Sequence, residues 1–439
     1  MQSGQFSSLS ALPASLPISS WFGQGFPPLL SWCVLVAAAA LAGHVVVRFT
    51  GFPRMLGYTA VGLVAGWLNF GDLPWPLQGT SAIVLQTAVG TSLLLAASQV
   101  SLRWLLRQPW LLLQSLAESA LALLATTAAV LALGVGWAVA LAVGVVAMAA
   151  SPAVLLRISA DLRASGAVTD RSLLLATLSS MYALLAAMVL TAAITPGAGA
   201  DTDAGLQLSA LGVGRLLGSA ALSLLWAGLL AVALWPVLRW RSSRSDTTAL
   251  YMLAALVATC VLADHWGGSA ALAFVVCGLL LRNLSPKPLV WPSAFGAANA
   301  MLNLLMFVLV ASMAAQVSLS VVLLAVVAAA TAARMLGKVG GVLLLGLGTG
   351  LGWRRQWPVA CAQTPASGLA LLLVSAIVVQ WLPINSAVAL AFTAIALPMV
   401  VLSEVAGVLL ASLALWRSGD GHRGIGPAAM NAKEKRHDA

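Results

Sequence analysis

The chain has 439 residues, of which 61% are hydrophobic and only 8% are charged, and its mean hydropathy is +0.99. Soluble globular proteins carry about 25% charged residues, so this composition excludes the water-soluble classes, including the nucleic-acid-binding proteins that a net charge of +10 would otherwise suggest. Apolar runs such as residues 120–135 also exceed the strand length of an outer-membrane barrel. The sequence therefore predicts an all-α polytopic membrane protein.

Thirteen apolar runs have about the length of a membrane helix. In chain order they are 29–50, 54–70, 82–103, 110–133, 137–160, 171–195, 206–236, 247–264, 269–282, 293–315, 319–346, 357–381 and 385–415. They predict a transmembrane domain over residues 29–415, preceded by an external segment (1–28) and followed by a basic cytoplasmic tail (416–439).

The charged residues alternate between the connections of these runs. Basic residues fill every second connection: Arg48 and Arg54; Arg103 and Arg107; Arg157, Arg163 and Arg171; Arg239, Arg241 and Arg244; Arg282 and Lys287; Arg354 and Arg355; and the tail. The others hold Asp72, Asp201, Asp203 and Asp264. Because cytoplasmic loops carry the excess of Lys and Arg, we expect an inner-membrane protein with its N-terminus outside and its C-terminus in the cytoplasm.

Two of the runs contain a proline near mid-span between small or hydroxyl residues. The fifth reads VAMAASPAV at 146–154, and the twelfth reads ACAQTPASGL at 360–369. A simple proline kink explains one such site. Two of them, seven crossings apart and therefore antiparallel, indicate an inverted repeat of six helices each, with 206–236 as the linker. Paired broken helices of this kind cross at the substrate site of many transporters.

Four ionisable residues lie deep within the predicted helices: Glu118, Arg334, Lys338 and Glu404. All four fall in the matching parts of the repeat, which we call the core (110–195 and 319–415); the remaining helices form a panel (29–103 and 247–315). Charges at such depth usually face a bundle interior or a water-filled path. We expect Glu118 and Arg334 to pair through the core, and we assign structural roles to Lys338 and Glu404.

Several short motifs, in order, resemble those of monovalent cation:proton antiporters of the Kef-type branch. They are GFPRMLGY at 51–58, GLVAG at 62–66, QVSLR at 99–103, ASPAV at 150–154, GSAALAF at 268–274, GLLL at 278–281, MFVLVASM at 306–313 and LSE at 402–404. The resemblance implies the sodium-proton antiporter-like fold, in which a core bundle contains two crossing broken helices. It also implies a homodimer formed through the panel.

The sequence departs from this family where its chemistry lies. Such antiporters carry an Asp midway along the helix after the first broken helix, whereas the matching place here reads LSSMYAL at 178–184. The second broken helix reads PASGL at 365–369, where many relatives have Pro-Arg-Gly-Glu-Phe. Arg334 matches the basic residue of the family's eleventh helix.

The predicted function is secondary transport, by alternating access, of a monovalent cation (Na+ or K+) in exchange for a proton. We expect Glu118 to exchange the proton while Arg334 balances its charge. The remaining predicted site residues are Ser151, Pro152, Ser179, Ser180, Gln363, Thr364 and Ser367. A carrier of a small anion and a transport-inactive membrane subunit or sensor remain as alternatives. No enzyme activity, cofactor or metal site is expected, since the four cysteines lack metal-ligand spacing.

Overall fold

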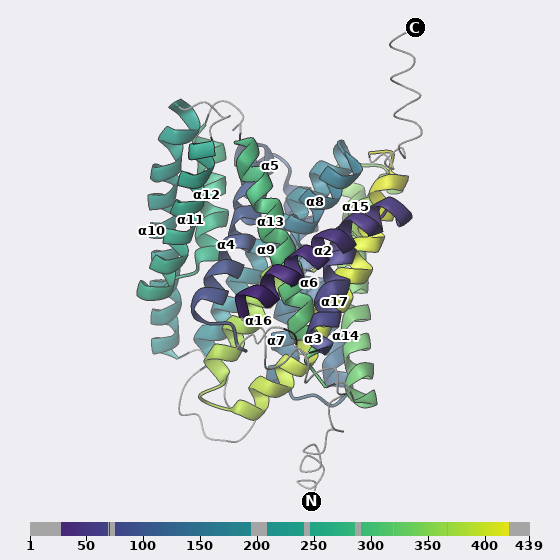
Figure 1. Ribbon diagram of the computed structural model, residues 1–439. Coiled ribbons are helices and arrows are strands. Elements are labelled where there is room, and N and C mark those ends of the chain that lie inside the picture. The colour runs from purple at the N-terminus through teal and green to yellow at the C-terminus, as the bar shows by residue number, and fades with distance from the viewer. Residues whose placement is uncertain are drawn as a thin grey trace, which may run out of the picture.

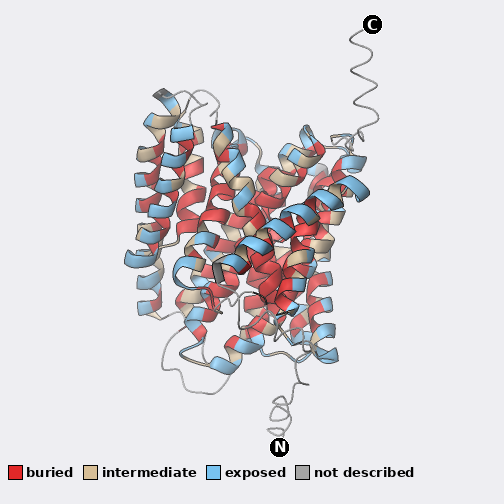
Figure 2. Ribbon diagram, in the orientation of Figure 1, coloured by how far each residue is buried: buried red, intermediate tan, exposed pale blue. Residues whose placement is uncertain are grey.

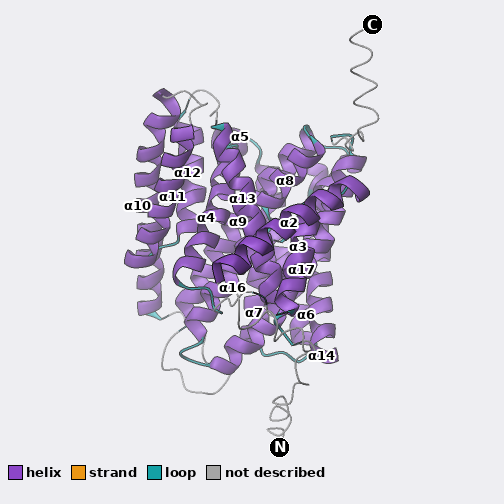
Figure 3. Cartoon of the chain, viewed as in Figure 1, coloured by secondary structure: helices purple, strands orange, loops and turns teal. Residues whose placement is uncertain are grey.

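The computed structural model of the chain describes residues 28–68, 70, 75–194, 209–240, 246–285, 291–318, 320–366 and 368–420. In these residues every regular element is a helix (Figure 3), as the composition predicts. The external segment before residue 28 and the tail after residue 420 lie outside the described residues.

The helices follow the predicted runs closely. Their bounds are α2 (Pro28–Thr50), α3 (Met55–Trp67), α4 (Gly79–Ala97), α5 (Leu102–Leu106), α6 (Pro109–Ala132), α7 (Trp137–Met148), α8 (Pro152–Leu162), α9 (Ala167–Ala193), α10 (Ala210–Trp240), α11 (Asp246–Trp266), α12 (Ala270–Leu284), α13 (Ser293–Ala315), α14 (Val321–Leu344), α15 (Trp353–Ala362), α16 (Gly368–Trp381) and α17 (Ser386–Arg417), with a short 3-10 turn η1 (Gly346–Thr349). Ten described segments are long and apolar enough to cross a membrane, and α3, α12 and α16 are shorter apolar helices. Together they correspond to the thirteen predicted crossings.

Both expected interruptions are present. The fifth crossing is divided into α7, which ends at Met148, and α8, which begins at Pro152. Proline is well suited to this first position because it has no N–H to leave unpaired, and the Ser151 hydroxyl accepts the Val154 N–H at 3.2 Å. The twelfth crossing is divided into α15, which ends at Ala362, and α16, which begins at Gly368. The Pro-containing motifs therefore mark two pairs of half-helices.

The helices are arranged in two groups (Figure 1). α10, α11 and α12 stand together at one side of the molecule, where residues such as Phe274 and Cys260 form an apolar cluster of their own. A larger cluster includes buried residues of the broken helices, α9 and α17. Figure 2 shows that buried residues concentrate in the middle of the bundle, while α2 and α10 have exposed faces. The division into core and panel remains our prediction, and we keep both names for the helices defined above.

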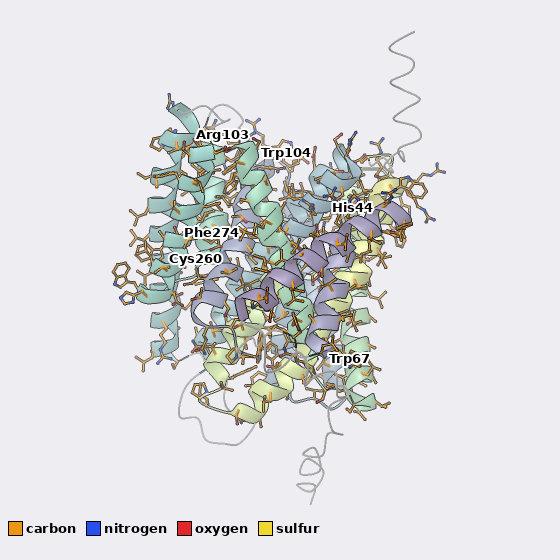
Figure 4. All side chains as sticks on the ribbon, in the orientation of Figure 1. His44, Trp67, Arg103, Trp104, Cys260 and Phe274 are labelled. Carbon is orange, nitrogen blue, oxygen red and sulfur yellow. The ribbon has the colours of Figure 1, made fainter. Side chains whose placement is uncertain are left out.

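Two of the basic residues used to predict the topology lie at the same end of the molecule. Arg103 and Trp104 lie at the end where α17 finishes with Arg417, and Trp67 lies toward the opposite end (Figure 4). We refer to these as the Arg103 end and the Trp67 end. Trp at an apolar-polar boundary is typical of the membrane interface.

Candidate functional site

Two glycines bring α14 into direct contact with the backbone of α6. A Cβ atom at Gly337 would lie 2.7 Å from the Leu121 carbonyl oxygen, and one at Gly341 would lie 2.7 Å from the Glu118 nitrogen, so neither position has room for a side chain. The four-residue spacing is the small-residue pattern that lets membrane helices approach closely. This contact places Lys338, which follows Gly337, opposite Glu118.

Lys338 and Glu118 form an ion pair that is fully buried. The Lys338 Nζ lies 2.6 Å from Glu118 Oε1, and neither side chain is exposed. Nζ also donates to the Ser179 hydroxyl at 2.7 Å and to the Met148 carbonyl at the end of α7. An ammonium has three donors and no acceptor, so all its donors have partners. Desolvation of both charges makes such a pair costly to break.

Two hydroxyl groups close this network into a ring. Ser119 lies 3.1 Å from Glu118 Oε2 and 3.2 Å from the Ser179 Oγ. Ser179 in turn donates to the Met148 carbonyl at 2.6 Å. A carboxylate, an ammonium, two hydroxyls and a backbone carbonyl therefore converge from α6, α7, α9 and α14. We call these five groups the Glu118 ring.

Arg334 binds both helix breaks at once. Its guanidinium donates to the Ala149 carbonyl at 2.7 Å, to the Thr364 carbonyl, and to the Pro365 carbonyl at 3.4 Å. These carbonyls follow the C-terminal ends of α7 and α15, where backbone acceptors lack helical partners and carry partial negative charge. The contacts place the two breaks side by side, and they satisfy carbonyl groups that would be costly to leave unpaired at this depth.

The structure corrects the assignment of the two cations. From the sequence we expect Arg334 to pair with Glu118 and Lys338 to have a structural role, but Lys338 makes the ion pair and Arg334 binds the backbone. The residues are four apart, which is about 6 Å along a helix. The glycine contact sets α14 at the height where Lys338, rather than Arg334, is level with Glu118.

The other predicted residues surround the two breaks. Ser180 donates to the Ala150 carbonyl at 2.9 Å, and Ser151 and the buried Pro152 begin α8. Gln363 donates to the Ser172 carbonyl at 2.9 Å, and its own buried oxygen has no hydrogen-bond partner among the described residues. Thr364 donates to the Cys361 carbonyl at 2.7 Å. These five side chains support the breaks, while Ser179 alone of the predicted serines joins the Glu118 ring. Ser367 is not among the described residues.

Ser119, the Met148 carbonyl and the glycine pair are not among the site residues predicted from the sequence. The glycine pair had a readable signal, since Gly337 and Gly341 match a small-xxx-small motif on the helix that carries both deep cations. Ser119 follows Glu118 directly. No metal-binding group of three His, Cys, Asp or Glu occurs within the described ranges.

A cavity of about 640 Å³ opens at the Trp67 end, between panel and core helices. It is lined by residues from the start of α4, the end of α9, the junction of α11 and α12, and α16. Asp264 is the single charged side chain among the described lining residues. The lining residue Leu184 is one turn of α9, about 6 Å, from Ser180. Ser179 of the Glu118 ring precedes Ser180, so along α9 the cavity lies five residues, about 7.5 Å, from the ring.

Three comparisons relate this geometry to known proteins. The family model described as "Sodium/hydrogen exchanger, transmembrane" matches residues 35–416. A solved structure of the sodium proton antiporter MjNhaP1 from Methanocaldococcus jannaschii, at pH 8, is 15% identical, with a TM-score of 0.65 over 90% of this chain and 98% of that one. An electron-microscopy structure of the same protein is 14% identical, with a TM-score of 0.66 over 92% and 99%. No curated protein sequence matches the chain.

Proposed function

Because the chain belongs to the sodium/hydrogen exchanger family, and is thus a multi-pass secondary active cation:proton antiporter, we propose that the Glu118 ring is where its cation and proton exchange. The cation is Na+ or K+. The observation that carries this proposal is the set of oxygen atoms around the Lys338 ammonium. Three of them, from Glu118, Ser179 and Met148, lie within 2.7 Å of Nζ.

The same oxygens form a suitable coordination shell for a monovalent metal ion. A carboxylate supplies the charge, and hydroxyl and carbonyl oxygens replace water, as backbone carbonyls do in potassium channels. The ammonium is itself a monovalent cation held by these ligands. A metal ion and a protonated Lys338 therefore compete for one position beside Glu118.

This competition gives an exchange with balanced charge. In this scheme the exchanged proton is on Lys338, and not on Glu118 as the sequence led us to expect. In one state Lys338 carries that proton and pairs with the Glu118 carboxylate. When Lys338 releases that proton and its amine moves aside, a metal ion takes the place of the ammonium and the net charge of the site is unchanged. Since Arg remains protonated in proteins, Arg334 holds the breaks throughout and takes no part in the proton transfer.

The surroundings favour a cation over an anion. Arg334 already binds carbonyl groups of both breaks, so its charge is not directed toward a substrate. The cavity at the Trp67 end contains Asp264 and, among the described lining residues, no Lys or Arg. An anion would therefore meet the negative charge of Asp264 in the cavity and an arginine that already donates to backbone carbonyls. This weakens the small-anion alternative.

We further propose a homodimer formed through the panel in the cytoplasmic (inner) membrane, with the Trp67 end outside. The positions of the basic residues support this orientation, and the exposed apolar face of the panel helix α2 is available to lipid or to a second copy. No catalysis is required of any residue in this scheme.

The test is transport by purified protein in vesicles that contain a pH-sensitive dye. We expect an imposed Na+ or K+ gradient to change the internal pH, and we expect Glu118→Gln to abolish that change when the two proteins are compared at equal amounts of folded protein. Asp161→Asn is a matched control, because Asp161 lies outside the ring and pairs with Arg157 at 3.7 Å.

Each alternative has its own outcome in the same assay. A pH change driven by organic or inorganic anions, and by no cation, would favour the anion carrier. If the unmodified protein exchanges none of the ions tested, the transport-inactive subunit is favoured. Exchange that survives Glu118→Gln with its pH profile intact would make Glu118 structural and would refute the proposed site.

A further inference from the structure

Glu404 is a second buried carboxyl group, and it lies outside the Glu118 ring. It is near the middle of α17 and 1% exposed. Its Oε1 accepts a hydrogen bond from the Thr59 hydroxyl of α3 at 2.8 Å. Because α3 belongs to the panel and α17 to the core, this contact spans the seam between the two groups of helices.

The other side of this carboxyl group lacks a partner. Glu404 Oε2 and the hydroxyl of the neighbouring Ser403 are both buried, and neither has a hydrogen bond to any described residue. Buried polar atoms without partners are rare enough in folded proteins that each one requires an explanation. An ionised carboxylate in this position would have a single hydrogen bond for two oxygens.

No described cation neutralises Glu404. The helices that pack on α17 are α3, α7, α8, α13, α14, α15 and α16. Their titratable or charged residues are Tyr58, Arg157, Asp161, Arg334, Lys338, Arg354, Arg355 and Cys361. Arg157 pairs with Asp161, Lys338 pairs with Glu118, Arg334 binds the breaks, and Arg354 and Arg355 are exposed. The described structure thus has no ion-pair partner for this carboxylate.

We propose that Glu404 is a second proton-binding site, protonated in this arrangement of α3 and α17. A neutral carboxylic acid avoids the desolvation cost of an unpaired buried charge. It keeps an acceptor oxygen for the Thr59 hydroxyl and gains an O–H donor.

The position of Glu404 couples this proton to the contact between panel and core. Loss of the proton would leave an uncompensated negative charge in the seam, so the ionised form favours separation of α3 from α17 and entry of water. Glu404 is also one turn from Gly407, where a Cβ atom would lie 2.5 Å from the Pro365 Cα at the second break. A change at the seam is therefore adjacent to the backbone that Arg334 binds.

Infrared spectroscopy of the purified full-length protein tests the proposal without requiring transport. The C=O stretch of a protonated carboxylic acid absorbs at a higher frequency than the bands of carboxylates and amides. We expect this band near neutral pH in the unmodified protein, its loss in Glu404→Gln, and no change in Glu118→Gln, because Glu118 is ionised in its pair with Lys338. A band that Glu404→Gln leaves intact would overturn the proposal.

Thr59→Val provides a second measurement if the Gln variant does not fold. It keeps the carboxyl group and removes the hydroxyl that donates to Oε1, so a Glu404 band should shift to higher frequency. A band that does not move, or no band in the unmodified protein, would also contradict a protonated Glu404. None of these outcomes depends on whether the vesicles show cation exchange.

Discussion

Lys338 is the residue whose surroundings matter most at the scale of single side chains. It is fully buried and every one of its donors is used, by a carboxylate, a hydroxyl and a carbonyl. Removing one partner of a buried ion pair leaves the other charge uncompensated, which costs about 3 to 5 kcal/mol. The pair therefore stabilises the folded protein only while both members are present.

We expect Lys338→Met to lower the thermal unfolding temperature in detergent markedly, by the equivalent of about 3 to 5 kcal/mol. The double variant Lys338→Met with Glu118→Gln should recover much of that loss, because neither remaining side chain is charged, but it should not recover exchange. Equal unfolding temperatures for the single and double variants would show that the two residues are not coupled.

Ser179 and Ser180 are adjacent in the sequence but have different hydrogen-bond partners. Ser179 accepts from Lys338 at 2.7 Å, whereas Ser180 donates to the Ala150 and Ala176 carbonyls. A hydrogen bond to a charged group contributes about 1.5 to 3 kcal/mol. We therefore expect Ser179→Ala to raise the apparent KM for the cation about tenfold or more. Ser180→Ala is the matched control, and a similar rise in that variant would argue against a direct role for Ser179.

At the scale of elements, the approach of α14 to α6 determines which cation meets Glu118. Gly341→Ala should force the helices apart, since the new Cβ would lie 2.7 Å from the Glu118 nitrogen. We expect a lower unfolding temperature and loss of exchange. Gly340→Ala is the control, because a Cβ there would have no atom within 4 Å. Equal behaviour of the two variants would mean that the close contact is not required.

How far the sequence predicts these elements depends on whether the signal is local. The breaks at Ser151-Pro152 and Thr364-Pro365 were predictable because proline removes a helical hydrogen bond at its own position. The partner of Glu118 was not, since Arg334 and Lys338 are both deep and basic and differ only in height along α14. That height is fixed by lateral contacts of Gly337 and Gly341, which involve residues more than 200 positions away in the chain. The role of Ser119 depends on the same packing.

At the scale of the whole molecule, the distribution of charge gives a testable orientation. Basic connections at the Arg103 end predict that this end faces the cytoplasm. A reporter fused after residue 439 should be active when it is of a type that works in the cytoplasm, and inactive when it is of a type that requires export. The opposite pattern would reverse the orientation and would place the cavity beside Asp264 on the cytoplasmic side.

Arg334 holds the two helix breaks together through three hydrogen bonds, which we call the clamp. The clamp has a consequence for how freely the sequence of this protein can diverge. Its three acceptors, at positions 149, 364 and 365, are backbone carbonyls. Every amino acid supplies a carbonyl, so substitutions at these positions preserve the clamp provided that the new side chain fits. The geometry of the crossing is therefore insensitive to the identity of the residues that form it. A lineage can replace the side chains at both breaks, including acidic ones, and keep the architecture, while the single arginine that holds the breaks cannot be exchanged.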